Sequence, residues 1–200
     1  MNERSMESTI RIIEKPASVS WEAIRQCLNE AHAPNRARKI KMSHYLWPAE
    51  RIRESLGERG VMLVAMDGDQ VVGTAALAER EHPVWYAGGR YAYLCFDGVI
   101  PGYTGQGIFS NLDERREALA QEMGYRVLVF DTHVRNKSRQ EMAIDRGYRR
   151  VRFFRAKSGD HNCVVLVKWL DSCPYSRLYC RWKLLRSRIK TLLKSMFSRG

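Results

Sequence analysis

The segment from residue 91 to residue 133 constrains the fold of this chain more than any other. It contains a strand pattern at Tyr91–Val99, a helical pattern that starts at Ile108 and stops at Gly124, and a buried strand pattern over residues 126–133. Two strands joined through a helix in this way are expected to be parallel. Asp67-Gly68 lies between two further strand patterns and predicts an antiparallel hairpin. The sequence therefore predicts an α/β domain built on a mixed sheet (α+β).

The rest of the chain supplies the other elements of this domain. Strands are recognised by an apolar period of 2 and helices by a period of 3.6, and turn residues mark their ends. In chain order we first expect an edge strand over Ser8–Lys15 and a helix that is capped by Ser18 or Ser20 and contains Trp21. A basic connection with Arg36, Arg38, Lys39 and Lys41 follows, then a helix from Pro48 to Gly57 and strands over residues 61–66 and 70–79. After residue 133 we expect a helix from Asn136 to Gly147 and strands over Arg149–Ala156 and Cys163–Trp169.

Positive charge is concentrated at the carboxyl-terminal end. The chain has 34 Lys and Arg against 22 Asp and Glu, a formal net charge of +12, and residues 172–200 hold eight of the bases and no acid. We therefore divide the chain into a domain at residues 1–171 and a basic segment at residues 172–200.

Composition excludes several classes of protein as first hypotheses. Hydrophobic residues make up 44% of the chain, which is typical of a globular domain, and apolar runs such as Val61–Met66 are too short to cross a membrane. The first residues include acids and no hydrophobic segment, so we expect no secretory signal and a cytoplasmic location. The five cysteines lack CxxC spacing, so we expect reduced thiols and no metal.

A glycine-bearing turn links the strand that ends at Val99 to the following helix. Its sequence is VIPGYTGQGIFS, residues 99–110. The first turn of a helix presents N–H groups and the positive end of the helix dipole, which together bind a phosphate. Gly105 and Gly107 remove side chains where the backbone must approach such an anion. A GxG pair also occurs in ordinary turns, so from the residues alone phosphate binding and a plain turn both stay open.

The segment resembles the acetyl-CoA pyrophosphate loop of the GNAT N-acetyltransferase superfamily. That family usually has a valine, two residues that include a proline, an aromatic residue, and then Arg/Gln-x-x-Gly-x-Gly/Ala. Asn136 opens the helix after the next strand and Gly147-Tyr148 ends it, in the family's order. The resemblance covers residues 8–170 and is strongest over 92–150. It implies a GNAT-like acyl-CoA N-acyltransferase fold, followed here by a basic amphipathic helix.

The same resemblance implies the cosubstrate, acetyl-CoA, and the residues that bind it. Loop N–H groups would bind the pyrophosphate, and Asn136 would hydrogen-bond the pantetheine arm. The loop positions are Val99, Thr104, Gly105, Gln106, Gly107, Ile108, Phe109 and Ser110. Three positions depart from the family pattern: Thr104 replaces Arg or Gln, Phe109 replaces Gly or Ala, and Ala143 replaces a tyrosine that many members use as general acid for the leaving thiolate.

Three polar residues at the ends of the two parallel strands are candidates for the catalytic chemistry. Asp97 lies two residues before Val99. Asp131 and His133 lie on the same face of the next strand, because successive side chains of a strand alternate between its two faces. In the family these strands splay apart around the thioester, so all three side chains could approach it. An amine that attacks a thioester needs a base for its proton, and a histidine titrates in a suitable range. The structural alternatives are that Asp131 caps a turn and that His133 hydrogen-bonds a loop.

Two further residues have a simpler interpretation as structural. Cys95 lies on the same strand as Asp97, but a buried cysteine commonly behaves as a small hydrophobic residue rather than an acyl-carrying nucleophile. His161 belongs to the turn SGDHN and could contact substrate, although a solvated turn residue is the simpler interpretation.

These observations predict an N-acetyltransferase that transfers an acetyl group to a primary amine by direct attack in a ternary complex. The expected acceptor is a small amine, such as an amino sugar used in surface-polysaccharide synthesis. The alternatives are a non-catalytic acyl-CoA-binding module and an acetyltransferase for a protein or RNA amine. The acyl chain length, the group that replaces the tyrosine at Ala143, and the oligomeric state, including a homodimer, stay open.

The basic segment has the pattern of an amphipathic helix over residues 175–197. Its apolar stripe consists of Leu178, Trp182, Leu185, Ile189, Leu192 and Met196. Such a helix can pack on its own domain, on a second chain, on nucleic acid or on an anionic membrane. No nucleic-acid reading motif is present. We expect the helix to hold the protein at the inner face of a membrane as a peripheral protein, with packing on its own domain as the main alternative.

Overall fold

A computed structural model describes residues 10–40, 47–157 and 161–197. The elements, in chain order, are β1 (Arg11–Glu14), α1 (Trp21–Ala31), α2 (Ala33–Ala37), α3 (Ala49–Leu56), β2 (Val61–Asp67), β3 (Gln70–His82), β4 (Gly89–Val99), the 3-10 turn η2 (Pro101–Tyr103), α4 (Ile108–Glu122), β5 (Val127–His133), α5 (Lys137–Asp145), β6 (Arg149–Arg155), β7 (Asn162–Trp169) and α6 (Arg177–Phe197). The predicted α/β class and element order are confirmed.

The structure adds one helix to the prediction. The stretch after Ala31 was expected to be a basic connection, but five of its residues form α2. Some of the predicted positions lie outside the described residues. They are Ser8 of the edge strand, Lys41 of the connection, the three residues before His161, and Arg199 of the basic segment. Ser20, rather than Ser18, caps α1, because its side chain accepts a hydrogen bond from the Ala23 N–H at 3.1 Å.

The seven strands follow the order β1-β2-β3-β4-β5-β7-β6. β4 and β5 are parallel, as the helical connection between them predicted, and the pairs β1–β2, β2–β3, β5–β7 and β6–β7 are antiparallel. The chain divides into two compact units, and β3, β4 and α4 each contribute residues to both. The boundary predicted between residues 171 and 172 stays a prediction.

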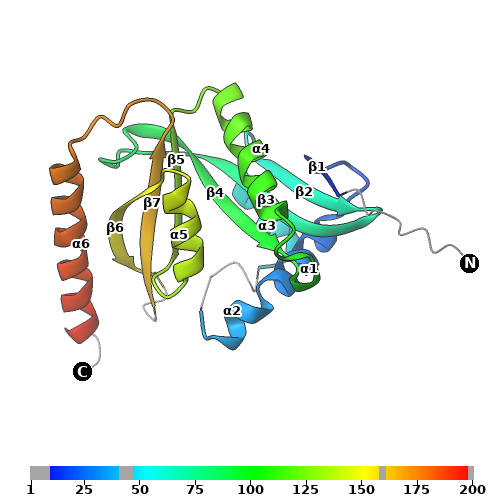
Figure 1. Cartoon of the computed structure of the whole chain (residues 1–200), viewed down its shortest axis with the longest axis horizontal. Coiled ribbons are helices and arrows are strands. Elements are labelled where there is room, and N and C mark those ends of the chain that lie inside the picture. The colour runs from blue at the N-terminus through cyan, green and yellow to red at the C-terminus, as the bar shows by residue number, and fades with distance from the viewer. Residues whose placement is uncertain (1–9, 41–46, 158–160, 198–200) are drawn as a thin grey trace, which may run out of the picture. The chain divides into compact units, whose positions relative to one another are not determined.

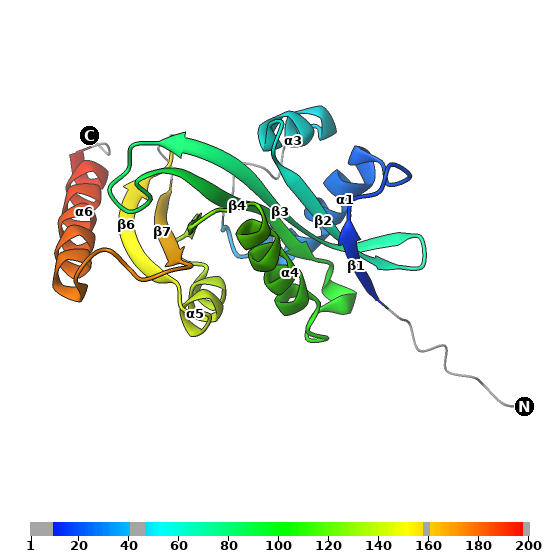
Figure 2. The same cartoon turned by 90° about the horizontal axis from the view of Figure 1, so that it is seen from above.

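The first unit comprises residues 1–34, 43–78 and 95–119. It holds α1, α3, the β1–β2–β3 strands, the end of β4 and most of α4. Figure 2 shows α1 and α3 on one side of these strands and α4 on the other. Both faces are therefore covered, and the strands are buried along most of their length, including Val64 and Val72 at 0% exposure.

A buried arginine fixes α4 to the strands of the first unit. The Arg116 side chain is fully buried, and its guanidinium pairs with Asp113 on the same helix and with Asp97 on β4. It also donates to the Ala76 carbonyl oxygen of β3 at 3.1 Å and to the Cys95 carbonyl oxygen at 3.4 Å. A buried guanidinium is tolerated where carboxylates and carbonyls surround it, so these contacts set the position of the helix.

The second unit comprises residues 35–42, 79–94 and 120–200. β5 lies between β4 and β7, and β6 is the outer strand of the group. One face carries an apolar cluster that includes Tyr91, Val129 and Val165. α5 packs on the opposite face, where Arg139 lies over the Phe130 ring, 4.2 Å from its centroid. Figure 1 shows α5 in front of β5 and β7, with α6 beside β6.

The predicted carboxyl-terminal helix is present as α6 and lies along β6 in the second unit (Figure 1). The Ser187 hydroxyl of α6 accepts a hydrogen bond from the Phe153 N–H of β6 at 2.9 Å. Because β6 is an outer strand, α6 covers backbone groups that a sheet edge would otherwise leave open. No helix among the described residues is both long and apolar enough to span a membrane.

Gly98 marks a close approach of α1 to β4 within the first unit. A Cβ atom at this position would lie 2.7 Å from the Ala31 Cβ. We predict that Gly98→Ala lowers the free energy of unfolding by about 1–3 kcal/mol, because strand and helix must move apart. Gly102→Ala is the matched control, since its Cβ would meet nothing within 4 Å. Denaturant unfolding of both variants measures the difference, and equal stabilities would contradict the close approach.

Candidate active site

The predicted site residues fall into both units, and each group has its own geometry. In the first unit, the glycine-bearing loop leaves β4 at Val99, makes the short turn η2 and enters α4 at Ile108. The Ile100 N–H donates to the Val72 carbonyl oxygen of β3 at 3.0 Å, and the Tyr103 hydroxyl donates to Asp67 at 2.6 Å. The loop is therefore fastened to the β2–β3 hairpin before it reaches the helix.

Gly105 and Gly107 have backbone φ angles of 82° and 76°. Residues with a side chain rarely adopt this left-handed region of backbone conformation, so the loop conformation depends on glycine at both positions. A Cβ at either glycine would meet nothing within 4 Å, and residues 104–107 are exposed. The Gly107 carbonyl oxygen accepts from the Asn111 N–H at 3.0 Å, which starts the α4 hydrogen-bond ladder. The loop thus forms an open cradle at the amino-terminal end of a helix, where an anion is stabilised.

The other loop positions have separate roles. Ile108 is buried and anchors the start of α4, whereas Phe109 and Ser110 are half-buried. The Thr104 hydroxyl donates to the Pro101 carbonyl oxygen at 2.8 Å, and the Gln106 amide donates to the Gly102 carbonyl oxygen at 3.4 Å. The side chains of Thr104 and Gln106 therefore brace the loop itself, and backbone groups are left as the main contact surface for an anion.

Asp97 takes part in a structural ion pair. Its carboxylate pairs with the buried guanidinium of Arg116, and its side chain is 18% exposed. Protonation of Asp97 would weaken this pair, because the buried cation would lose one of its two carboxylates. A general-base role for Asp97 stays a prediction, and it competes with this pairing.

In the second unit, the end of β5 carries Asp131 beside a tyrosine of β4. β4 and β5 pair at Ala92↔Leu128 and Tyr93↔Val129, and β5 then continues to His133. The Tyr93 hydroxyl donates a hydrogen bond to the Asp131 carboxylate. Burial raises the pKa of Asp131 above its ordinary value of 3.8, while the Tyr93 hydrogen bond and the charge of His161 act in the opposite direction.

His133 and His161 stack beside this carboxylate. Their ring centroids are 5.2 Å apart and the planes differ by 9°. His133 is buried, and its Nδ1 accepts a hydrogen bond from the Arg135 N–H at 3.0 Å. A neutral ring that accepts at Nδ1 carries its proton on Nε2. The Nδ1 lone pair of His133 is therefore used in the hydrogen bond to the loop that follows β5. The structure therefore brings Asp131, Tyr93, His133 and His161 together within one unit.

Asn136 lies at the start of α5, as predicted, and is buried. Its side-chain amide donates to the Thr132 hydroxyl at 3.2 Å. Gln140, one turn later, donates to the Val134 and Asn136 carbonyl oxygens at 3.1 and 3.2 Å. Ala143 is fully buried and accepts a backbone hydrogen bond from Tyr148. At the position where many family members have a tyrosine, α5 therefore has a small, buried side chain and no hydroxyl.

None of the five cysteines forms a disulfide, and Cys95 is half-buried. Within residues 10–40, 47–157 and 161–197, no group of three or more His, Cys, Asp or Glu side chains is arranged to hold a metal ion.

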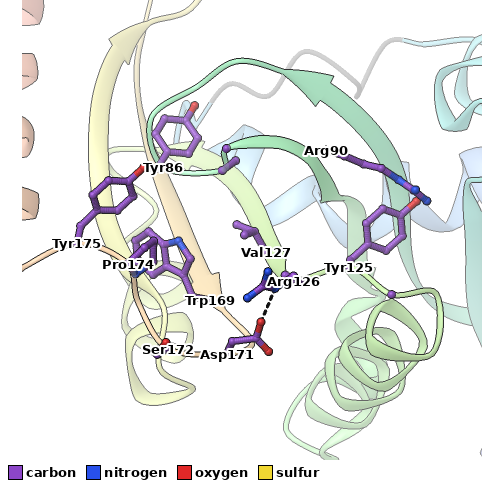
Figure 3. Close-up of a pocket in the computed structure, with 13 residues that line it drawn as sticks. Tyr86, Arg90, Tyr125, Arg126, Val127, Trp169, Asp171, Ser172, Pro174 and Tyr175 are labelled. Carbon is purple, nitrogen blue, oxygen red and sulfur yellow. Dashed lines mark hydrogen bonds and ion pairs between the residues drawn. The ribbon is translucent and has the colours of Figure 1, made fainter.

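A pocket of about 460 Å³ opens in the second unit at the other end of β5. Figure 3 shows Tyr86, Trp169 and Tyr175 on one side of it and Tyr125 with Arg90 on the other, with Arg126 paired to Asp171. It adjoins Val127, where β5 begins, whereas Asp131 and His133 lie toward the strand's end. None of the predicted site residues lines this pocket, so it is separate from the candidate chemistry.

A strand that ends in an open glycine cradle at a helix terminus is the arrangement of α/β proteins that bind phosphate-bearing cosubstrates. The family model described as the acetyltransferase (GNAT) family matches residues 21–148. The chain belongs to the GNAT acetyltransferase family, which confirms the resemblance seen in the sequence. Members of this family use acetyl-CoA or CoA. No curated protein matches the chain significantly.

Solved structures show the same fold. The ribosomal-protein-S18-alanine N-acetyltransferase from Escherichia coli superposes with a TM-score of 0.61 at 16% identity, over 82% of this chain and 95% of that one. A GNAT-family acetyltransferase from Staphylococcus aureus Mu50 gives 0.61 at 20% identity, over 81% and 99%. A chain of the NatC complex bound to Gag peptide and CoA gives 0.61 at 16% identity, over 80% and 99%. At these identities the likeness establishes the fold alone.

Sequence reasoning missed two residues that organise the site. Tyr93 looked like one more apolar strand residue, because the parallel register that sets it beside Asp131 is a tertiary feature. Arg116 was not considered, although Asp113 lies three residues before it and could have signalled a pair. His161 was considered as a possible substrate contact and, more simply, as a solvated turn residue; the β6–β7 hairpin brings it to His133.

The raised pKa of Asp131 predicts a specific pH dependence of stability. Below about pH 4 the carboxyl is neutral in both states and carries no penalty. As the pH rises, the unfolded state loses its proton first, so the contribution of Asp131 to the free energy of unfolding falls until the folded pKa is passed. Asp131→Asn lacks this penalty.

We therefore expect the stability of Asp131→Asn relative to the wild type to increase from about pH 4 upward and then level off. Denaturant unfolding at a series of pH values measures this difference. Glu141→Gln, at an exposed carboxylate on α5, is the control for the removal of one carboxylate charge. A relative stability that decreases with pH would show that Asp131 is stabilised, rather than penalised, in its charged form.

Proposed function

We propose that this GNAT-family protein is an N-acetyltransferase that transfers the acetyl group of acetyl-CoA to a primary amine by direct attack in a ternary complex. The observation that carries the proposal is the exposed cradle of Gly105 and Gly107, both at positive φ, at the amino-terminal end of α4. In a member of this family, that cradle has the geometry to bind the pyrophosphate through backbone N–H groups. Asn136 is proposed to hydrogen-bond the pantetheine arm.

We propose Asp131 as the group that takes the proton from the attacking amine. Burial raises its pKa, and a base whose pKa lies closer to the working pH is more effective. The amine nitrogen forms a bond to the thioester carbonyl carbon, the carbon–sulfur bond breaks, and the sulfur takes up the proton held by Asp131. The reaction then needs no tyrosine at the position of Ala143.

The two other catalytic candidates take supporting roles in this proposal. His133 uses Nδ1 to accept the Arg135 N–H and so holds the loop that follows β5. Asp97 holds Arg116 and so positions α4, which carries the cradle. Tyr93 positions the Asp131 carboxylate through its hydrogen bond.

The acceptor that we propose is a small amine, such as an amino sugar on a nucleotide or lipid carrier. We further propose a cytoplasmic location with the carboxyl-terminal helix at the inner face of the membrane. A protein amine is the alternative acceptor, since structural relatives named for ribosomal protein S18-alanine and for a bound Gag peptide share the fold. A panel of small amines and amino-terminal peptides, assayed for thiol release, separates the two acceptor classes.

A non-catalytic acyl-CoA-binding module is the second candidate function. The observation that favours it is Ala143, which is fully buried where many relatives have their acidic tyrosine. Such a module would bind acetyl-CoA and release no thiol with any amine. The catalytic proposal requires thiol release that depends on both the amine and Asp131.

The cradle predicts a variant that loses the cosubstrate. Gly107→Asp places a negative charge where the pyrophosphate is proposed to bind and strains a backbone at φ 76°. We expect calorimetry to report acetyl-CoA binding at least about 100-fold weaker, because like charges in contact cost several kcal/mol. Gly124→Asp is the matched control, with φ 77° and equally open space beyond the other end of α4. Unchanged affinity in Gly107→Asp, or equal losses in both variants, would reject the cradle.

The proton-transfer role predicts a kinetic defect without a binding defect. Asp131→Asn should lower kcat by about 100-fold to 10,000-fold and leave the acetyl-CoA affinity unchanged. Glu141→Gln should keep wild-type kcat. Tyr93→Phe removes a hydrogen bond that lowers the Asp131 pKa, so the acidic limb of its kcat/KM profile should move to higher pH. A wild-type kcat in Asp131→Asn would contradict the assignment.

A further inference from the structure

The apolar stripe of α6 is exposed although the helix is packed on its own unit. Each of the six residues predicted to form the stripe is between 49% and 78% exposed, with Leu178 and Met196 the most exposed. Leu193 and Phe197 extend the same surface at 47% and 84%. Outside α6, the exposed large apolar side chains among the described residues are Met142 and Ile144, at 39% and 38%. Single exposed apolar residues are ordinary, but a contiguous exposed stripe marks an interaction surface.

The face of α6 that packs on the domain lies opposite the stripe. Cys180 and Thr191 are the buried residues of the helix, and Ser187 bonds β6. Because a helix turns about 100° per residue, these three residues lie on the side directly opposite Leu185 and Ile189. The helix therefore docks through these small and polar side chains and through Tyr179, whose ring centroid lies 5.5 Å from that of Trp85, and it directs the stripe outward. This reverses the usual orientation of an amphipathic helix on a globular domain.

Basic residues border the stripe on both sides. By the same helical geometry, Arg177, Arg181 and Arg188 lie along one side, and Lys183, Arg186, Lys190 and Lys194 lie along the other. No acid occurs in α6. Trp182 adds an amphipathic ring that is 50% exposed, with the Arg186 guanidinium 5.5 Å from its centroid. Apolar side chains flanked by long basic ones, with a tryptophan at the boundary, are the pattern of a helix in a lipid–water interface.

We propose that the outward surface of α6, formed by the stripe and its two basic borders, binds the surface of an anionic lipid membrane. The helix lies parallel to the membrane, the stripe enters the acyl boundary, and the Lys and Arg side chains reach the lipid phosphates. The docked face of the helix stays on β6, so the whole second unit is held at the membrane. This proposal is independent of the acetyl transfer.

Charge decides between the membrane and the other occupants of this surface. Pairing of two copies through their stripes would bring seven bases of each α6 together with no acid on either helix. A nucleic acid would pair with the bases but leave the apolar stripe in water. An anionic membrane satisfies both parts of the surface at once.

The test is co-flotation of the full-length protein with phosphatidylcholine vesicles that contain or lack phosphatidylglycerol. Binding to the anionic vesicles is expected, and it should weaken but persist at high salt, because the apolar contribution is not screened. Leu185→Gln with Ile189→Gln should weaken binding at least about tenfold. Arg181→Gln with Lys190→Gln should weaken it about 25-fold, at about fivefold for each charge.

The matched control is Met142→Gln with Ile144→Gln, which makes the same change at exposed apolar positions of α5 and should leave vesicle binding unchanged. Equal thermal unfolding temperatures establish that the variants are folded. No wild-type flotation, or a stripe variant that floats as the wild type does, would overturn the proposal. If the wild type does not bind vesicles, two other results would also overturn the proposal. One is self-association that is lost in the stripe variant, and the other is tight binding of duplex DNA or RNA.

Discussion

The buried guanidinium of Arg116 is the interaction on which the proposed cosubstrate site depends. It joins Asp113 of α4 to Asp97 and the Cys95 carbonyl of β4 and to the Ala76 carbonyl of β3. Removal of one partner from such a cluster leaves an uncompensated buried charge, so the cluster holds the helix in one position. Because α4 begins at the glycine cradle, the same contacts fix where the first turn of the helix presents its N–H groups.

The second unit places a buried carboxyl where the proposed mechanism needs a proton acceptor. Ala143 closes α5 at the position of the common tyrosine, and the polar side chains gather at the end of β5. Burial and the Tyr93 hydrogen bond act on the pKa of Asp131 in opposite directions, and burial prevails. The raised pKa makes this carboxylate a stronger base than that of an ordinary aspartate, which is the property that the proposed mechanism uses.

The carboxyl-terminal helix uses its two faces for different purposes. The docked face uses small and polar side chains, such as Ser187 on the Phe153 N–H of β6, together with the ring of Tyr179 on Trp85. The large apolar side chains are then available for a surface outside the protein. An apolar stripe is usually taken as the face that packs on the core, and here that inference from periodicity alone would have assigned the wrong face.

The sequence by itself determined the family, the α/β class, the order of the strands and helices along the chain, and the loop at residues 99–110. These depend on local signals: apolar periodicity, Asp67-Gly68, and glycines at positions that require positive φ, such as Gly105 and Gly107. Only the tertiary structure decided which polar groups meet. Tyr93 reaches Asp131 through a parallel register, His161 reaches His133 across a hairpin, and Asp97 is taken up by Arg116. Strand register and helix docking are set by packing between distant segments, which a local pattern does not encode.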